Sequence, residues 1–173
     1  MTHILSAPHN FLHDATDWKA GLWAGAIAGV VVLLLEMVLV WLVQGQSPWV
    51  PMHRVSAMVL GSEALLVSDG WSGFDLRIVL VALMVQVPLS IALGMGAAWL
   101  MYRFDWAGGL LVGVGFGLAL YLINFHLLAP AMFPWFEAAQ TWILVVSHLV
   151  YGVTLTVIYM SLRKPKIPNT YLT

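Results

Sequence analysis

The chain contains the segment Gly109-Leu-Leu-Val-Gly113-Val-Gly-Phe-Gly117, in which a glycine stands at every fourth position. An earlier segment, Gly21-Leu-Trp-Ala-Gly25-Ala-Ile-Ala-Gly29, has the same spacing. In both halves a polar residue follows the third glycine by seven positions, Glu36 in the first and Asn124 in the second, and a Pro-Trp pair lies further along. This matched spacing predicts that the chain is built from two related halves.

The composition indicates a membrane environment. Hydrophobic residues make up 61% of the chain, charged residues only 9%, and the mean hydropathy is +0.91. Soluble domains carry about 25% charged residues. Four apolar runs approach the roughly 20 residues that cross the hydrocarbon core as a helix. We therefore predict an all-α integral membrane protein with one domain, 19–163, and with spans at about 21–43, 77–102, 108–129 and 140–162.

The segments outside the spans are more polar. Residues 1–18 form a polar arm with three histidines, and residues 164–173 form a tail. A shorter apolar run at 51–67 is interrupted by His53, Arg54 and Glu63. It is too short and too charged to cross a membrane, so we expect a helix that lies on the outer face of the bundle or in the interface.

Basic residues predict the orientation. One side of the membrane would receive Arg54 and Arg77, and the other would receive Lys19, Arg103, Arg163, Lys164 and Lys166. The positive-inside rule then places both termini, the arm and the tail in the cytoplasm. We expect the bacterial inner membrane as the location.

The matched spacing also predicts how the helices are arranged. If the first and third spans are equivalent, so are the second and fourth, and both helical hairpins enter the membrane from the same side. They would be parallel repeats about an axis along the membrane normal. Small residues allow close helix packing in lipid, so we expect the first and third spans to pack together through two glycine rows. The alternative is that glycines are simply common in membrane helices. The rows are Gly21, Gly25, Gly29, Gly109, Gly113 and Gly117.

Five polar side chains fall in the outer half of the predicted spans, namely Glu36, Gln86, Asn124, His126 and His148. A carboxylate inside a membrane is costly unless it is protonated or paired. We therefore expect Glu36 to face the bundle interior and to share a hydrogen bond with one of the others. The cluster either holds the helices in register or forms a site for a proton, a metal ion or a small polar ligand.

Metal binding is an alternative for this cluster. Glu36, His126 and His148 would supply a carboxylate and imidazoles, which suit zinc or copper. Two histidines on neighbouring helices could also hold a haem iron, although His126 and His148 differ in depth by about 10 Å at the helical rise per residue. We expect no cofactor, with haem, copper and zinc as the alternatives.

The sequence shows no nucleophile motif, phosphate-binding loop or paired carboxylates, and we do not expect an enzyme. It also lacks the basic patch of a nucleic-acid-binding protein. Apolar residues occupy nearly every helix face, which indicates contact with lipid and with another membrane subunit or a second copy. We predict an accessory, non-catalytic subunit that stabilises a larger membrane assembly, such as a respiratory or redox complex. The alternative is a small metal-, haem- or proton-handling protein, or a transporter, that uses the polar cluster.

Several short motifs also suggest a family. They are Ser47-Pro-Trp49, Arg54, Phe133-Pro-Trp-Phe136 and Ser147-His148-Leu-Val-Tyr-Gly152. With these motifs the chain resembles small four-helix bacterial inner-membrane proteins, some of which carry a symporter-like label. The resemblance covers nearly the whole chain and implies a four-helix fold and a location in the inner membrane.

Overall fold

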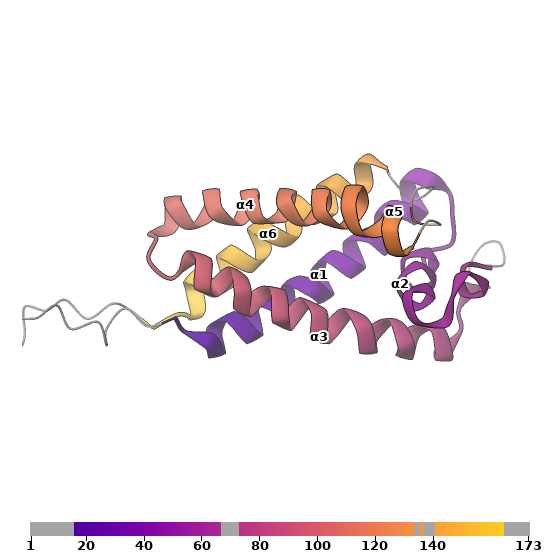
Figure 1. Cartoon of the computed structure of the whole chain (residues 1–173), viewed down its shortest axis with the longest axis horizontal. Coiled ribbons are helices and arrows are strands. Elements are labelled where there is room, and N and C mark those ends of the chain that lie inside the picture. The colour runs from indigo at the N-terminus through magenta and orange to yellow at the C-terminus, as the bar shows by residue number, and fades with distance from the viewer. Residues whose placement is uncertain (1–15, 67–72, 134–135, 137–140, 165–173) are drawn as a thin grey trace, which may run out of the picture.

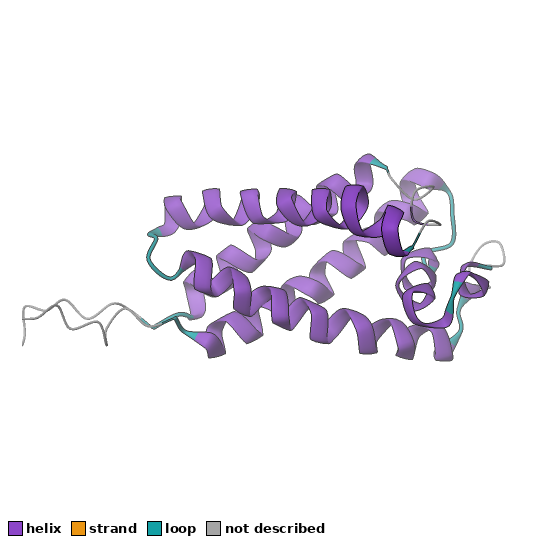
Figure 2. Cartoon of the chain, viewed as in Figure 1, coloured by secondary structure: helices purple, strands orange, loops and turns teal. Residues whose placement is uncertain are grey.

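The computed structural model describes residues 16–66, 73–133, 136 and 141–164. These residues form helices joined by short loops and contain no strand (Figure 2). Most of the predicted polar arm with its three histidines, the Pro134-Trp135 pair and the end of the basic tail lie outside the described residues.

Four apolar helices dominate the structure. They are α1 (Trp18–Gln44), α3 (Leu76–Met101), the continuous helix formed by α4 (Trp106–Leu122), η4 (Ile123–Leu128) and α5 (Ala129–Met132), and α6 (Trp142–Leu162). Each is long and apolar enough to cross a membrane. The prediction of four such helices is therefore confirmed, and the third is longer at both ends than the predicted 108–129.

Aspartates fix where three of these helices begin. Asp17 accepts a hydrogen bond from the backbone N–H of Ala20, and Asp105 accepts one from Gly108. Asp75 accepts from the N–H groups at the start of α3. The first N–H groups of a helix have no partner within the helix, and an Asp at this position supplies one. The carboxylates also suit the positive end of the helix dipole.

The helices follow the spatial order α3, α1, α6, α4. α1 packs against α3 and α6, α6 also packs against α4, and α3 and α4 have few contacts with each other. Figure 1 shows α3 and α4 starting at a shared turn and separating toward the other end of the bundle. Arg163 donates to the carbonyl oxygen of Phe104 in this turn at 2.8 Å, and the backbone N–H of Lys164 donates to Asp17, so both described chain ends lie beside the turn. We call this the terminal end of the bundle.

The glycine rows do not pack on each other, and the predicted contact between the first and third spans is wrong. Gly21, Gly25 and Gly29 face α3, where a Cβ at these positions would meet residues from Ser90 to Ala98. The second row faces α6 instead, where its partners lie between His148 and Met160. Each row therefore joins two helices of the same half of the chain.

The closest backbone approaches occur at a glycine on each partner helix. A Cβ on Gly94 would lie 2.6 Å from both the Gly21 carbonyl oxygen and the Gly25 nitrogen. A Cβ on Gly152 would overlap the Gly113 carbonyl and lie 3.1 Å from the nitrogen of Gly117. The two halves thus use the same kind of contact, but at different positions in the glycine rows. Gly94 meets the first two glycines of its row, and Gly152 meets the last two of the other row, which is a shift of one helical turn. The parallel repeat itself stays a prediction.

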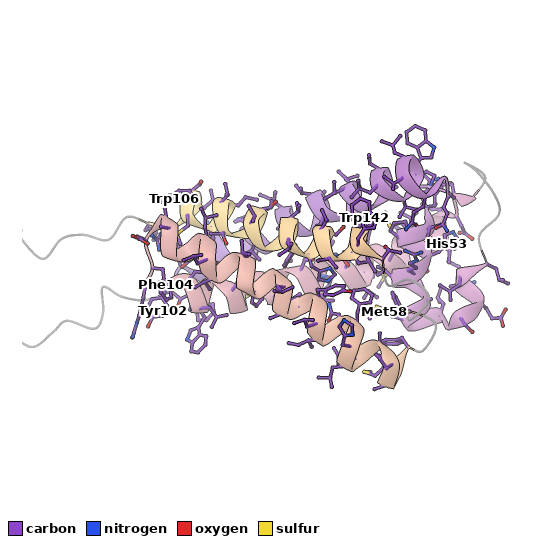
Figure 3. The ribbon with its side chains drawn as sticks, turned by 90° about the horizontal axis from the view of Figure 1, so that it is seen from above. His53, Met58, Tyr102, Phe104, Trp106 and Trp142 are labelled. Carbon is purple, nitrogen blue, oxygen red and sulfur yellow. The ribbon has the colours of Figure 1, made fainter. Side chains whose placement is uncertain are left out.

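Short helices close the other end of the bundle, which we call the cap end. α2 (Val50–Leu60) and η2 (Ser62–Leu65) replace the single helix predicted at 51–67. The chain turns between them at Gly61, whose φ of 88° favours glycine. α2 packs on α3 and α1, and His53 is one of its buried residues. The helix therefore lies against the bundle (Figure 3).

His53 ties the cap together through both ring nitrogens. Nδ1 lies 2.7 Å from the carbonyl oxygen of Ala64, and Nε2 lies 2.9 Å from the carbonyl oxygen of Gly73. One buried side chain therefore joins α2 to η2 and to the segment that leads into α3. In the sequence this histidine is visible only as an interruption of an apolar run.

The glycine contacts give a matched test. Gly94→Ala places a methyl group against the backbone of α1, whereas Gly96→Ala points into open space on the same helix. We expect Gly94→Ala to destabilise the folded protein by about 1–3 kcal/mol, the usual cost of overpacking. Gly96→Ala should be neutral or slightly stabilising, because alanine favours helix. Equilibrium unfolding in mixed micelles measures both, and equal effects would contradict the contact.

Candidate functional site

A cavity of about 190 Å³ lies at the cap end, where α3 and α4 are separated. α1 and α6 line it between these two helices, and α2 together with Phe133 and Phe136 closes it toward the end of the bundle. Its apolar lining includes Val32, Leu33, Leu89, Leu93, Leu120, Phe125, Leu128 and Leu144. Mostly apolar walls with a few convergent polar groups are typical of small-molecule sites.

The polar lining comes from five helical segments. It consists of Glu36, Arg54, Gln86, Ser90, Asn124, Ser147, His148 and Tyr151. The structure thus brings together Glu36, Gln86, Asn124 and His148 from the predicted cluster. His126 does not line the cavity; it is exposed on the outside of the helix, with its ring edge-on to Tyr121 at 5.6 Å.

His148 is held from several sides. Its Nδ1 donates to the carbonyl oxygen of Leu144, one turn earlier, at 2.8 Å. Its Nε2 lies 3.4 Å from the side-chain nitrogen of Asn124. With the proton on Nδ1, the free electron pair of Nε2 accepts from the Asn124 amide, so the two bonds agree on one neutral tautomer. The rings of Tyr121 and Phe125 contact the imidazole edge-on at 5.9 and 5.7 Å.

A π-helical segment carries two of the side chains that line the cavity. In η4 the N–H of Ala129 donates to the carbonyl oxygen of Asn124, five residues earlier. The next residue is Pro130, which has no N–H and whose ring would clash with a carbonyl in a regular α-helix. Asn124 and Phe125 line the cavity, and His126, two residues after Asn124 and so on the opposite side of the helix, lies outside. Apolar spacing does not reveal such a segment, although the proline marks its position.

Glu36 faces the interior as predicted, but its neighbours differ from those expected. The groups that act on its carboxyl are the hydroxyl of Ser147 and the guanidinium of Arg54. The Ser147 hydroxyl is fully buried and lies close to the carboxyl, yet without the distance and angles of a hydrogen bond. The expected hydrogen bond between Glu36 and another member of the cluster stays a prediction.

Arg54 is a site residue that was not predicted: in the sequence it served as a charge interrupting the 51–67 run, in the orientation count and in the family motifs, but not as a member of the polar cluster. It extends from α2 over the cavity and is half-buried. Burial lowers the pKa of its guanidinium below the usual range, and the charge of Glu36 partly opposes this shift. A charged residue within an otherwise apolar amphipathic run was the available signal.

The deeper wall is organised by Ser90 on α3. Gln86 donates to the Ser90 hydroxyl at 3.4 Å, and the hydroxyl of Tyr151 on α6 donates to the Ser90 carbonyl at 3.1 Å. Pro88 lies between Gln86 and Ser90, and α3 continues as a helix through it. The missing N–H of a proline frees a carbonyl one turn earlier, so this part of α3 relies on side-chain contacts.

The cavity has an opening in the side of the bundle. Leu89 on α3 and Leu128 on η4 both line it, and they are 44% and 41% exposed. They belong to the two helices that separate toward the cap end. The opening therefore lies between helices that are apolar enough to span a membrane, rather than at the terminal end.

The predicted metal ligands are not assembled. Within the part of the chain that the structure describes, no three His, Cys, Asp or Glu side chains come together as a metal site would require. His126 lies outside the cavity that contains Glu36 and His148. The same separation means that His126 and His148 do not face one shared haem position.

Comparisons with protein-family models, with curated proteins and with solved structures find no match for the chain. The proposals below therefore rest on the residues and geometry of this molecule.

The unpaired hydroxyl in the cavity gives a second test. Ser147→Ala removes a buried hydroxyl without a hydrogen bond, whereas Thr156→Val removes one that donates to the Gly152 carbonyl at 2.8 Å. A buried polar group without a partner costs about 1–3 kcal/mol. We expect Ser147→Ala to leave the free energy of unfolding unchanged or to raise it, and Thr156→Val to lower it by about 1 kcal/mol. Unfolding of the ligand-free protein in micelles measures both, and a clear loss for Ser147→Ala contradicts the unpaired state.

Proposed function

We propose that this chain is a multi-pass protein of the bacterial inner membrane that binds a small polar ligand in the cavity at its cap end. One observation carries the proposal: the fully buried Ser147 hydroxyl has no hydrogen-bond partner among the described residues, and it lines a cavity that is also lined by Glu36 and Arg54. Buried polar groups are normally hydrogen-bonded, and a group without a partner inside a cavity is suited to a ligand. We propose binding or transport rather than catalysis.

The charges support an orientation for this site. Lys19, Arg103, Arg163 and Lys164 lie on or beside the terminal end, and Arg54 and Arg77 lie at the cap end. Under the positive-inside rule the terminal end is cytoplasmic and the cap end faces outward. The ligand then reaches the cavity from the outer half of the membrane.

A cavity-filling pair of variants tests ligand binding. Leu120→Trp fills the cavity from α4, and Leu118→Trp adds the same ring on the exposed face of that helix. The protein is purified in mild detergent and denatured, and the small molecules that it releases are identified by mass spectrometry. We expect one compound from the wild type and from Leu118→Trp, and at least about tenfold less from Leu120→Trp, a change equal to about 1.4 kcal/mol of binding.

The matched variant decides the outcome. If the wild type and Leu120→Trp release the same compounds in the same amounts, the cavity binds none of them and the proposal fails.

An accessory role in a larger membrane assembly is a second candidate, and His126 favours it. This imidazole is exposed on a helix apolar enough to span a membrane, among exposed Leu122, Ile123 and Leu127. Polar side chains within membranes usually face protein or a water-filled cavity, because exposure to lipid is costly. An adjoining subunit of a respiratory or redox complex, or a second copy, would give His126 a partner.

Substitution of the exposed histidine tests this role. His126→Leu keeps the size of the side chain and removes its hydrogen bonds, and Leu111→Ala alters the same helix at an exposed apolar position. We expect His126→Leu to lower the amount of a co-migrating subunit or of the dimer at least about tenfold in native gels. Leu111→Ala should not. A monomeric wild-type chain without any other subunit would contradict the accessory role.

A further inference from the structure

Two opposite charges face the same cavity without forming an ion pair. Glu36 on α1 and Arg54 on α2 both line it, and each acts electrostatically on the other. Among the described residues, neither has a nitrogen–oxygen ion-pair contact within 4.0 Å, and Arg54 donates no hydrogen bond. They are near enough to attract each other but are not in ion-pair contact.

This arrangement leaves the carboxyl of Glu36 and the guanidinium of Arg54 without an ion-pair contact among the described residues. Charged groups removed from water are normally paired and hydrogen-bonded, because attraction must offset the loss of hydration. Here both groups line the cavity, and the buried hydroxyl of Ser147 lies close to Glu36. A ligand with an anionic group for Arg54 and a donor group for Glu36 would satisfy both ends at once.

The remaining walls define the body of such a ligand. Leu93, Leu120, Leu144, Phe125 and Val32 surround the polar groups with hydrocarbon. A purely polar molecule would bury its surface against these side chains without compensating hydrogen bonds. A molecule with an apolar body gains from the same contacts. The chemistry therefore favours a compact molecule with both charges at one end and hydrocarbon at the other.

Accepting the ligand-binding function proposed above, we infer that the ligand is a small zwitterion with an apolar body, of the class of the branched aliphatic amino acids. Its anionic group binds the guanidinium of Arg54, and its ammonium group donates to the carboxyl of Glu36. The Ser147 hydroxyl supplies a further hydrogen bond on the Glu36 side. Gln86, Asn124 and His148 line the same cavity and would surround the charged end of the ligand.

Three probes with the same hydrocarbon body test the contributions of the ligand's two charged groups separately. Free leucine carries both groups, 4-methylpentanoate lacks the ammonium, and 3-methylbutylamine lacks the carboxylate. Binding to the purified full chain in mild detergent is measured by titration calorimetry at one pH and one salt concentration. We expect leucine to bind at least about tenfold more tightly than either analogue, since a site built for a polar group rejects ligands that lack it.

Charge-removing variants assign each group to its partner. Glu36→Gln should bring the affinities of leucine and 4-methylpentanoate within about threefold of each other, and Arg54→Gln should do the same for leucine and 3-methylbutylamine. Arg77→Gln removes an exposed positive charge at the same end and should leave the wild-type order of affinities unchanged. Circular dichroism and the elution volume of each variant confirm that it is folded.

The outcomes separate this inference from the function on which it rests. If leucine binds no more tightly than its analogues, or no probe binds, while the wild type still releases a compound that Leu120→Trp does not, the zwitterion is wrong and the ligand site stands. If leucine binds equally well to the wild type and to Leu120→Trp, and no released compound depends on position 120, both are overturned.

Discussion

The structure depends on how closely pairs of helices approach through their backbones. At Gly94 and Gly152 there is no room for a side chain between neighbouring helices. In a membrane the apolar surface of a helix gains little by leaving lipid, so close packing and hydrogen bonds must hold helices together. The two contacts join α1 to α3 and α6 to α4, and α1 and α6 then pack on each other as the central pair. α3 and α4 are left on the outside.

The cavity results from this order. α3 and α4 are joined by a short turn at the terminal end, but their close partners are different helices, and nothing draws them together toward the cap end. The space between them is lined by α1 and α6 and is closed by α2, which His53 fastens to its surroundings. Polar groups that could not face lipid without cost face this space instead. The site is therefore a product of helix order rather than of a local motif.

Sequence patterns predicted the elements of this arrangement better than their partners. Length and hydropathy located the four apolar helices, and the cost of a carboxylate in lipid indicated that Glu36 faces inward. A row of glycines indicates close packing against another helix, but it does not identify which helix that is. For this reason α1 was wrongly predicted to pack against α4. His126 was misplaced because the five polar residues were grouped by their depth in the membrane alone, although a residue two positions after Asn124 lies on the opposite side of the helix. Arg54 was missed because an arginine outside the spans usually faces water.

The π-helical segment η4 contributes to both the cavity wall and the outer surface of the protein, and this links the two. Asn124 and Phe125 belong to the cavity wall, and His126 belongs to the outer surface. Each residue added to or removed from a helical turn rotates the rest of the helix by about 100°. Any change at the outer surface that unwinds or tightens this turn therefore also moves the side chains inside. The cavity wall and the outer surface are therefore coupled through one segment of backbone, which ends at Pro130, a residue that has no N–H to donate.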